Sequence, residues 1–182
     1  RKGRRTGLGI TAEGDMLAAL GLRYGTPEAT AFAVKVQKTL ALEAYRASVK
    51  MAAERGAFEI FDARKEEKNP MIGRIREADP ELYAEMVKHG RRNIAMLTIA
   101  PTGTTSLMSQ TTSGIEPVFR PVYKRRRKIN PSDQDAKVAF VDDMGEKFEE
   151  YNVYHHNFVK CLEANGYDTA KLHDISDEEV TR

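Results

Sequence analysis

Residues 98–119, TIAPTGTTSLMSQTTSGIEPVF, concentrate small hydroxyl side chains where an apolar stretch ends. The residues at this point are Pro101, Thr102, Gly103, Thr104, Thr105 and Ser106. The first N–H groups of a helix have no internal partner and lie at the positive end of its dipole. Glycine lets a ligand approach the backbone, and hydroxyls add donors. A strand followed by this turn therefore predicts a phosphate site formed by these six residues.

The same spacing also fits a capped turn that binds nothing, and spacing alone favours that simpler interpretation because Ser and Thr caps are common. No lysine occupies the Walker position, so the turn is not the P-loop of a nucleoside triphosphate hydrolase. The following loop, SGIEP at residues 113–117, holds Glu116 between an apolar residue and a proline. Its carboxylate is expected either to accept hydrogen bonds from a sugar or to brace the neighbouring turn.

Residues 123–128, YKRRRK, place five basic residues beside an aromatic ring. A nucleic-acid groove uses such a patch. Alternation along a strand would direct these side chains to opposite faces, and acidic stretches lie close by in the sequence. We therefore favour a solvated strand that makes internal ion pairs, and a nucleic-acid partner is not expected.

Composition excludes several classes of protein. The chain has 182 residues, 41% hydrophobic and 31% charged, which fits one folded domain, and its formal net charge of +2 does not argue for a polyanionic partner. No apolar run approaches the length of a membrane span. The single cysteine, Cys161, excludes an internal disulfide framework and cysteine-pair redox chemistry, and it fits a reducing compartment, most simply the cytoplasm. His155 and His156 make no convincing ligand set with Cys161, so no metal site is expected.

Helical patterns dominate the first half of the chain. Thr26, followed by Pro27, predicts the start of a long helix that ends before Gly56. Its predicted buried face consists of Ala29, Phe32, Ala33, Val36, Leu40, Ala44 and Tyr45. Thr11 is expected to cap a shorter helix that ends near Gly21. A solvated charged connection is expected at 62–69, followed by short helices at 70–77 and 80–89.

The second half alternates between strand and helix signals. Residues 93–100 are short and apolar, as expected of a strand buried on both faces. Residues 115–130 are extended by composition, with prolines at 117 and 121. After Pro131 the chain is acidic and predicted to be helical over 141–151, 154–168 and 175–182. Helices alternating with apolar strands and polar strand-end loops indicate an α/β fold.

Four segments together resemble one family. They are RRTGLGI, RRNIAMLTIAPTGTTS, SGIEPVF and VYKRRRKINP. Their order and spacing are similar to the carboxy-terminal part of the ten-stranded α/β barrel of the ribonucleotide reductase catalytic subunit. The last segment is most similar to the adenosylcobalamin-dependent class II branch. In one departure, Thr105 stands where many relatives have isoleucine.

The resemblance implies definite roles. It assigns Pro101, Thr102, Gly103, Thr104, Thr105 and Ser106 to the phosphates of a ribonucleotide substrate. It assigns Gly114, Ile115 and Glu116 to the active-site wall, and RRTGLGI to a barrel strand and turn. The thiyl-radical cysteine of the family and its two reducing cysteines have no counterpart here, so no catalytic residue is expected in this chain and the chain alone is expected to be inactive.

The resulting hypothesis is a helix-rich piece of a ribonucleotide reductase, which converts ribonucleotides to deoxyribonucleotides with adenosylcobalamin as radical source. Residues 1–130 would supply barrel strands, helices and the phosphate loop, and residues 131–182 an acidic helical extension. The expected partners are the ribonucleotide, the remaining half of the barrel and an external thiol reductant such as thioredoxin. The alternative is a non-catalytic nucleotide- or phosphate-binding module that lacks the radical cysteines.

Overall fold

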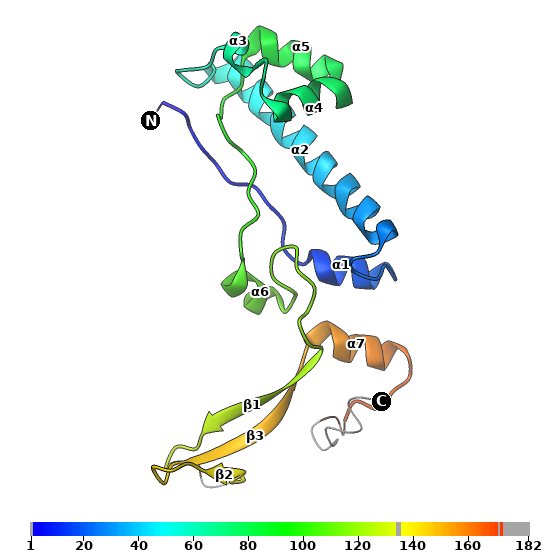
Figure 1. Cartoon of the computed structure of the whole chain (residues 1–182), viewed down its shortest axis with the longest axis vertical. Coiled ribbons are helices and arrows are strands. Elements are labelled where there is room, and N and C mark those ends of the chain that lie inside the picture. The colour runs from blue at the N-terminus through cyan, green and yellow to red at the C-terminus, as the bar shows by residue number, and fades with distance from the viewer. Residues whose placement is uncertain (1, 134–135, 171, 173–182) are drawn as a thin grey trace.

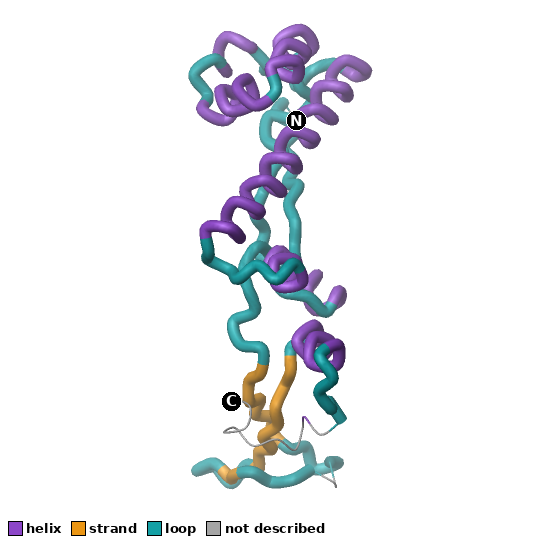
Figure 2. Tube along the Cα trace, turned by 90° about the vertical axis from the view of Figure 1, so that its right-hand side faces the viewer, coloured by secondary structure: helices purple, strands orange, loops and turns teal. Residues whose placement is uncertain are grey.

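The computed structural model describes residues 2–133, 136–170 and 172. The molecule is elongated, with a group of helices at one end, a small sheet at the other and two extended segments between them (Figures 1 and 2). The elements are α1 (Glu13–Ala19), α2 (Pro27–Arg55), α3 (Ala63–Glu66), α4 (Pro70–Ala78), α5 (Pro80–His89), α6 (Gly103–Ser109), β1 (Val122–Lys128), β2 (Phe140–Val141), β3 (Lys147–Tyr154) and α7 (His156–Ala164).

The helix α2 begins and ends where the sequence predicts. The Thr26 hydroxyl accepts a hydrogen bond from the Ala29 N–H, Pro27 follows at the first helical position, and Gly56 ends the helix with a φ of 79°. The predicted helices at 70–77 and 80–89 are confirmed as α4 and α5, which begin at prolines capped by Asn69 and Asp79.

The main core lies where the carboxy-terminal half of α2 meets α4 and α5. It consists of Tyr45, Val49, Ile72, Ile75, Leu82, Met86 and Met96. The buried face predicted for α2 is correct at Ala29 and Tyr45, and the five positions between them are only half buried. These positions lie on the part of α2 that borders a groove instead of another helix.

The connection at 62–69 was expected to be solvated throughout. Instead, its Glu66 forms an ion pair with the buried Arg91. Arg91, 2% exposed, donates from Nη1 to Glu66 Oε2 at 2.8 Å and from Nη2 to Glu66 Oε1 at 2.9 Å. The guanidinium also lies over the rings of Tyr45 and Phe58, at 5.7 and 5.5 Å. Burial raises the pKa of the Tyr45 hydroxyl. The pair anchors α3 to the helical end of the molecule.

The two extended segments run parallel. A bridge joins Leu8 to Leu97, Leu8 N–H donates to Met96 O, and Thr98 N–H donates to Leu8 O. Gly9 permits this approach, because a Cβ there would collide with the carbonyl oxygen of Thr98. The prediction of a strand at 93–100 buried on both faces is wrong. Only Leu97 of this segment forms a bridge to another segment of the described chain, and although Asn93 and Met96 are buried, Ile99 is 64% exposed.

The sheet has the order β1-β3-β2, with both pairs antiparallel. The helix predicted at 141–151 is therefore wrong: Gly145, with a φ of 81°, lies in the turn between β2 and β3, and the Asp142 carboxylate caps that turn by accepting from the N–H groups of Met144 and Glu146. Because β1 pairs with β3, a boundary near residue 130 would divide one sheet. The helix predicted at 154–168 is confirmed as α7, and the one at 175–182 lies outside the described residues.

The basic residues of β1 face carboxylates of β3 and the turns, as expected for a solvated strand. Arg126 Nε lies 2.6 Å from Glu150 Oε1, and Arg127 Nε lies 2.6 Å from Glu149 Oε1. Lys128 pairs with Glu146. Within the described part of the chain, no helix is both long and apolar enough to cross a membrane.

Candidate functional site

The loop predicted to bind phosphate lies near the middle of the molecule, where the extended segment turns into α6 (Figure 1). Thr11, just before α1, and Gly114, in the loop of residues 111–117, form hydrogen bonds with Thr102 of this loop. Asp15 of α1 in turn connects the loop of residues 111–117 to Asn157 of α7. Together they form a polar junction between the helical end and the sheet.

The start of α6 presents unused donors. Thr102 takes a left-handed conformation, with φ 43° and ψ 24°, and the helix begins at the next residue. Among the described residues, the N–H groups of Gly103, Thr104 and Thr105 and the hydroxyls of Thr104 and Thr105 have no hydrogen-bond partner. These residues are exposed, and a Cβ at Gly103 would meet no atom within 4 Å. The surface at this turn is therefore rich in donors and open to a ligand.

The other two hydroxyls of the loop have internal partners. Ser106 is buried, and its hydroxyl donates to Gly103 O at 2.7 Å. Thr102 Oγ1 accepts from the Gly114 N–H at 2.7 Å and lies 2.8 Å from Thr11 Oγ1. The prediction that Thr11 caps this short helix is therefore wrong: the cap position of α1 is Ala12, without a side-chain hydrogen bond.

The three residues expected in the active-site wall lie beside this turn. Gly114 is buried with a φ of 56°, where a Cβ would collide with Glu116 Oε2 and lie 3.3 Å from Ala100 O. Ile115 is half buried and Glu116 is exposed. The backbone of Glu116 also packs on α1, because a Cβ at Gly14 would lie 2.6 Å from the Glu116 carbonyl oxygen. These contacts fix the loop against both α1 and the entry to α6.

Asp15 is a central residue of the junction that the sequence analysis did not find. Its Oδ2 accepts from the Thr112 N–H at 2.9 Å and from the Asn157 amide at 2.8 Å, and its own N–H donates to Thr112 Oγ1 at 3.2 Å. His155 Nε2 lies 3.8 Å from Asp15 Oδ1. The partners of Asp15 are 97 and 142 residues away in the sequence, so no local pattern could identify them.

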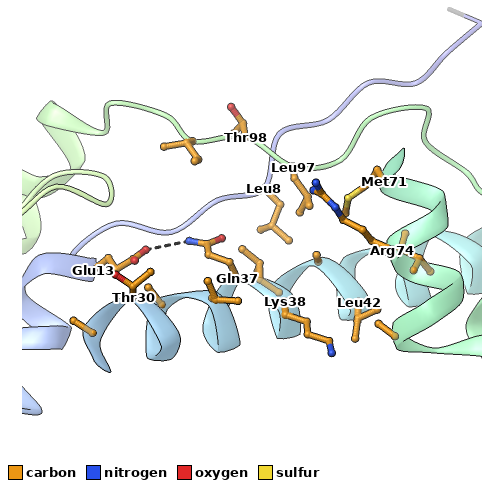
Figure 3. A pocket seen from close by; sticks show the side chains of 18 of the residues that line it. Leu8, Glu13, Thr30, Gln37, Lys38, Leu42, Met71, Arg74, Leu97 and Thr98 are labelled. Carbon is orange, nitrogen blue, oxygen red and sulfur yellow. Dashed lines mark hydrogen bonds between the residues drawn. The ribbon is translucent and has the colours of Figure 1, made fainter. Parts of the chain in front are cut away.

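An apolar groove opens beside the two extended segments (Figure 3). Its volume is about 1060 Å³, and α2, α4 and the extended segments line it. Glu13 lies at one end, where its Oε2 accepts a hydrogen bond from Gln37 at 3.0 Å. The groove walls include Leu8, Leu97 and Ile99, each at least one third exposed. The groove therefore offers an apolar surface rather than polar ligands.

The described part of the chain holds one thiol and one donor-rich turn. Cys161 lies exposed on α7, with the Asn165 amide 3.7 Å from its sulfur. No three His, Cys, Asp or Glu side chains in the described ranges converge as metal ligands would. The donor-rich turn at α6 suits an anion.

Comparison with known proteins establishes the family. The model of the family described as "Ribonucleotide reductase, barrel domain" matches residues 1–181, and the chain belongs to this family. Its α/β elements are part of that barrel domain.

Curated relatives of the chain are named as ribonucleoside-diphosphate reductases. A vitamin B12-dependent ribonucleoside-diphosphate reductase of Mycobacterium tuberculosis (strain H37Rv) is 36% identical over 126 residues, covering 69% of this chain and 15% of the relative. A protein of the same name from Thermoplasma acidophilum is 34% identical over 166 residues, covering 91% of this chain and 19% of the relative. A ribonucleoside-diphosphate reductase subunit alpha of Treponema pallidum is 30% identical, covering 69% and 15%. The chain thus spans less than a fifth of the length of these relatives.

Proposed function

We propose that this chain forms part of a ribonucleotide reductase that converts ribonucleotides to deoxyribonucleotides, and that residues 101–106 bind the substrate phosphates. The observation that carries the proposal is the open turn at the start of α6, where three consecutive N–H groups have no partner among the described residues. Membership of the reductase barrel family supports a nucleotide as the anion.

Each part of the turn has a role in this proposal. The N–H groups of Gly103, Thr104 and Thr105 donate to phosphate oxygens, with the hydroxyls of Thr104 and Thr105 beside them. Gly103 leaves room for the phosphate, because beyond its chain neighbours and its own helix backbone no protein atom lies within 4 Å of the position of a Cβ there. Pro101 and Ser106 hold the turn from either side, Ser106 by donating to Gly103 O.

The neighbouring loop forms the wall of the same site. Gly114 keeps the backbone close to Ala100, and Ile115 and Glu116 border the ligand. Glu116 is exposed and could accept hydrogen bonds from the ribose hydroxyls.

The complete enzyme would depend on adenosylcobalamin, as the names of the mycobacterial and Thermoplasma relatives suggest. The described residues do not fit a corrinoid. The open turn suits an anion, and the groove is lined mainly by apolar surface. The cofactor, which supplies the radical, is therefore assigned to other parts of the enzyme. The radical cysteine and the reducing cysteines would also come from there, because the one cysteine here, Cys161, lies exposed on α7.

The partners proposed for this chain follow from its surfaces. The remaining strands of the reductase barrel would cover the apolar groove beside Leu97 and Ile99. An external thiol reductant such as thioredoxin would renew the reducing cysteines of the complete enzyme. A chain with one unpaired cysteine fits a reducing compartment, and we place the enzyme in the cytoplasm.

Complementation tests the function. The chain is co-expressed with a reductase segment that carries the radical cysteine, and deoxyribonucleotide formation is assayed with and without adenosylcobalamin. Cobalamin-dependent product is expected from the wild-type chain. A Gly103→Val variant, whose side chain would occupy the space proposed for the phosphate, should reduce product by at least tenfold without preventing assembly.

The other outcomes separate the alternatives. An assembled complex without product would argue against the enzyme, and titration of the chain with a ribonucleoside diphosphate would then test the phosphate-binding module. Equal activity of wild type and Gly103→Val would contradict the proposed position of the phosphate.

A further inference from the structure

Thr102 lies inside a continuous chain of hydrogen bonds. The Gly114 N–H donates to Thr102 Oγ1 at 2.7 Å, Thr102 Oγ1 lies 2.8 Å from Thr11 Oγ1, and the Thr11 hydroxyl donates to Thr112 O at 3.2 Å. These bonds connect the start of α6, the segment before α1 and the loop of residues 111–117.

The two ends of this chain fix the direction of every bond in it. The Gly114 N–H can only donate and the Thr112 carbonyl can only accept. Because the Thr11 proton points to Thr112 O, Thr11 must accept in its contact with Thr102. Thr102 therefore donates its single hydroxyl proton to Thr11.

A phosphate oxygen needs a donor, and the Thr102 hydroxyl has no proton left for it. We propose that Thr102 is a positioning residue of the phosphate site, with Thr11 as its partner, and that it does not bind the phosphate through its side chain. This inference rests on the proposed function and refines it: the direct side-chain donors are then Thr104 and Thr105, whose hydroxyls have no partner among the described residues.

The position of Thr102 explains what its side chain would contribute. Its backbone takes a left-handed conformation that is uncommon for a β-branched residue, so the surrounding contacts must hold it. Its hydroxyl holds the Gly114 N–H, and this bond couples the wall loop to the first turn of α6. Thr11 completes the coupling by binding both Thr102 and the carbonyl of Thr112. The open N–H groups of residues 103–105 are thereby kept in one orientation.

The test uses the 182-residue chain and two measurements. One is the dissociation constant of inorganic pyrophosphate, followed through the amide resonances of residues 103–105. The other is the hydrogen-exchange rate of the Gly114 amide without ligand. The variants are Thr102→Val, Thr102→Ser, Thr11→Val, the double variant Thr11→Val/Thr102→Val, and Thr104→Val as the matched direct-donor control.

A positioning role predicts a specific pattern. Thr102→Val should raise Gly114 exchange and weaken pyrophosphate binding, each by about tenfold, and Thr102→Ser should restore both. Thr11→Val should weaken binding several-fold although it does not touch the ligand, and the double variant should be no weaker than Thr102→Val because the two act as one unit. Thr104→Val should weaken binding and leave Gly114 exchange unchanged.

Two results would overturn the inference or its basis. If Thr102→Val weakens binding but leaves Gly114 exchange unchanged, and Thr11→Val changes neither, then Thr102 binds the phosphate directly. If the wild-type chain does not bind pyrophosphate, the phosphate site itself fails. The Gly114 exchange rates would then still show whether Thr11 and Thr102 hold the loop of residues 111–117. Exchange at the wild-type rate in both Thr11→Val and Thr102→Val would exclude this positioning role.

Discussion

Arg91 shows how much the stability of the helical end depends on one acidic partner. Its guanidinium is 2% exposed, and Glu66 accepts one hydrogen bond from each of its two terminal nitrogens. We expect Glu66→Gln to lower the free energy of unfolding by about 3 kcal/mol, because the buried cation loses its counter-charge. Urea unfolding monitored by circular dichroism measures the change.

An exposed pair provides the matched control for this prediction. Glu43 lies 3.4 Å from Arg46, and both side chains are at least half exposed. Glu43→Gln should change stability by less than about 0.5 kcal/mol, because water screens the pair. Equal effects of the two substitutions would mean that the Arg91–Glu66 pair is not buried in solution.

At the scale of residues, the sequence predicts side-chain types better than their partners. The Thr-rich turn and Glu116 were recognisable from local order, and the turn does lie at a helix start. The sequence could not predict that the Thr102 hydroxyl is hydrogen-bonded to Thr11, because the two residues are 91 positions apart. Asp15 was missed for the same reason.

Among the elements, α5 begins at a cap that also responds to pH. Asp79 Oδ1 accepts from the Leu82 N–H at 2.9 Å, and Arg46 donates to Oδ2 at 2.6 Å. The bond from Leu82, together with that from Arg46, lowers the pKa of the Asp79 carboxyl. Below its unfolded pKa of about 4, the unfolded chain binds this proton more readily than the folded chain, so stability falls as pH falls through the lowered pKa.

The prediction for Asp79→Asn follows from that sign. The variant should be less stable than wild type at pH 7, and the difference should shrink as pH falls below about 4. Chemical unfolding of both proteins at pH 7, 5, 4 and 3 gives the comparison. A difference that stays constant over this range would show that the charge of Asp79 does not contribute.

The strand β1 is basic, and the carboxylates of β3 compensate it. Glu149 and Glu150 each lie 2.6 Å from an arginine of β1. We expect the wild-type chain to show no steeply salt-dependent binding to a polyuridine oligonucleotide at about 50 mM salt. Glu149→Gln/Glu150→Gln should create such binding, because it removes the carboxylate of Glu150 from Arg126 and leaves Arg127 with Asp133 alone. Fluorescence anisotropy would measure it.

A second double variant separates local from total charge. Glu28→Gln/Glu54→Gln changes the net charge equally, at exposed positions of α2 far from the sheet in sequence. It should leave oligonucleotide binding unchanged. Strong binding by the wild type would instead support a nucleic-acid role for β1.

The elements that could be predicted are those with strong end signals. Thr26, Asn69 and Asp79 each cap a helix that begins with proline, and all three helices were predicted. The structures of residues 93–100 and 141–151 were predicted wrongly, because they depend on segments that are distant in the sequence. The first segment lacks a strand partner on one side among the described residues, and the second is a strand through its pairing with β1.

For the whole molecule, the groove between α2 and the extended segments is an open apolar surface. Ile99 is 64% exposed and Leu8 46%, although both side chains are large and apolar. Among the described residues, the N–H groups of Leu97 and Ile99 also have no hydrogen-bond partner. An apolar surface beside an open backbone edge favours association with another strand.

The isolated chain should therefore form oligomers, and the groove should be where they join. Light scattering at increasing concentration is expected to show a rising mean mass for the wild type. Ile99→Lys should lower that mass towards the monomer, because a charge in the groove opposes apolar contact and edge pairing. Met144→Lys is the matched control, since Met144 is 87% exposed in the turn between β2 and β3 and lies outside the groove. A monodisperse wild-type monomer would mean that the groove closes on itself in solution, and equal effects of the two lysines would point to net charge rather than to this surface.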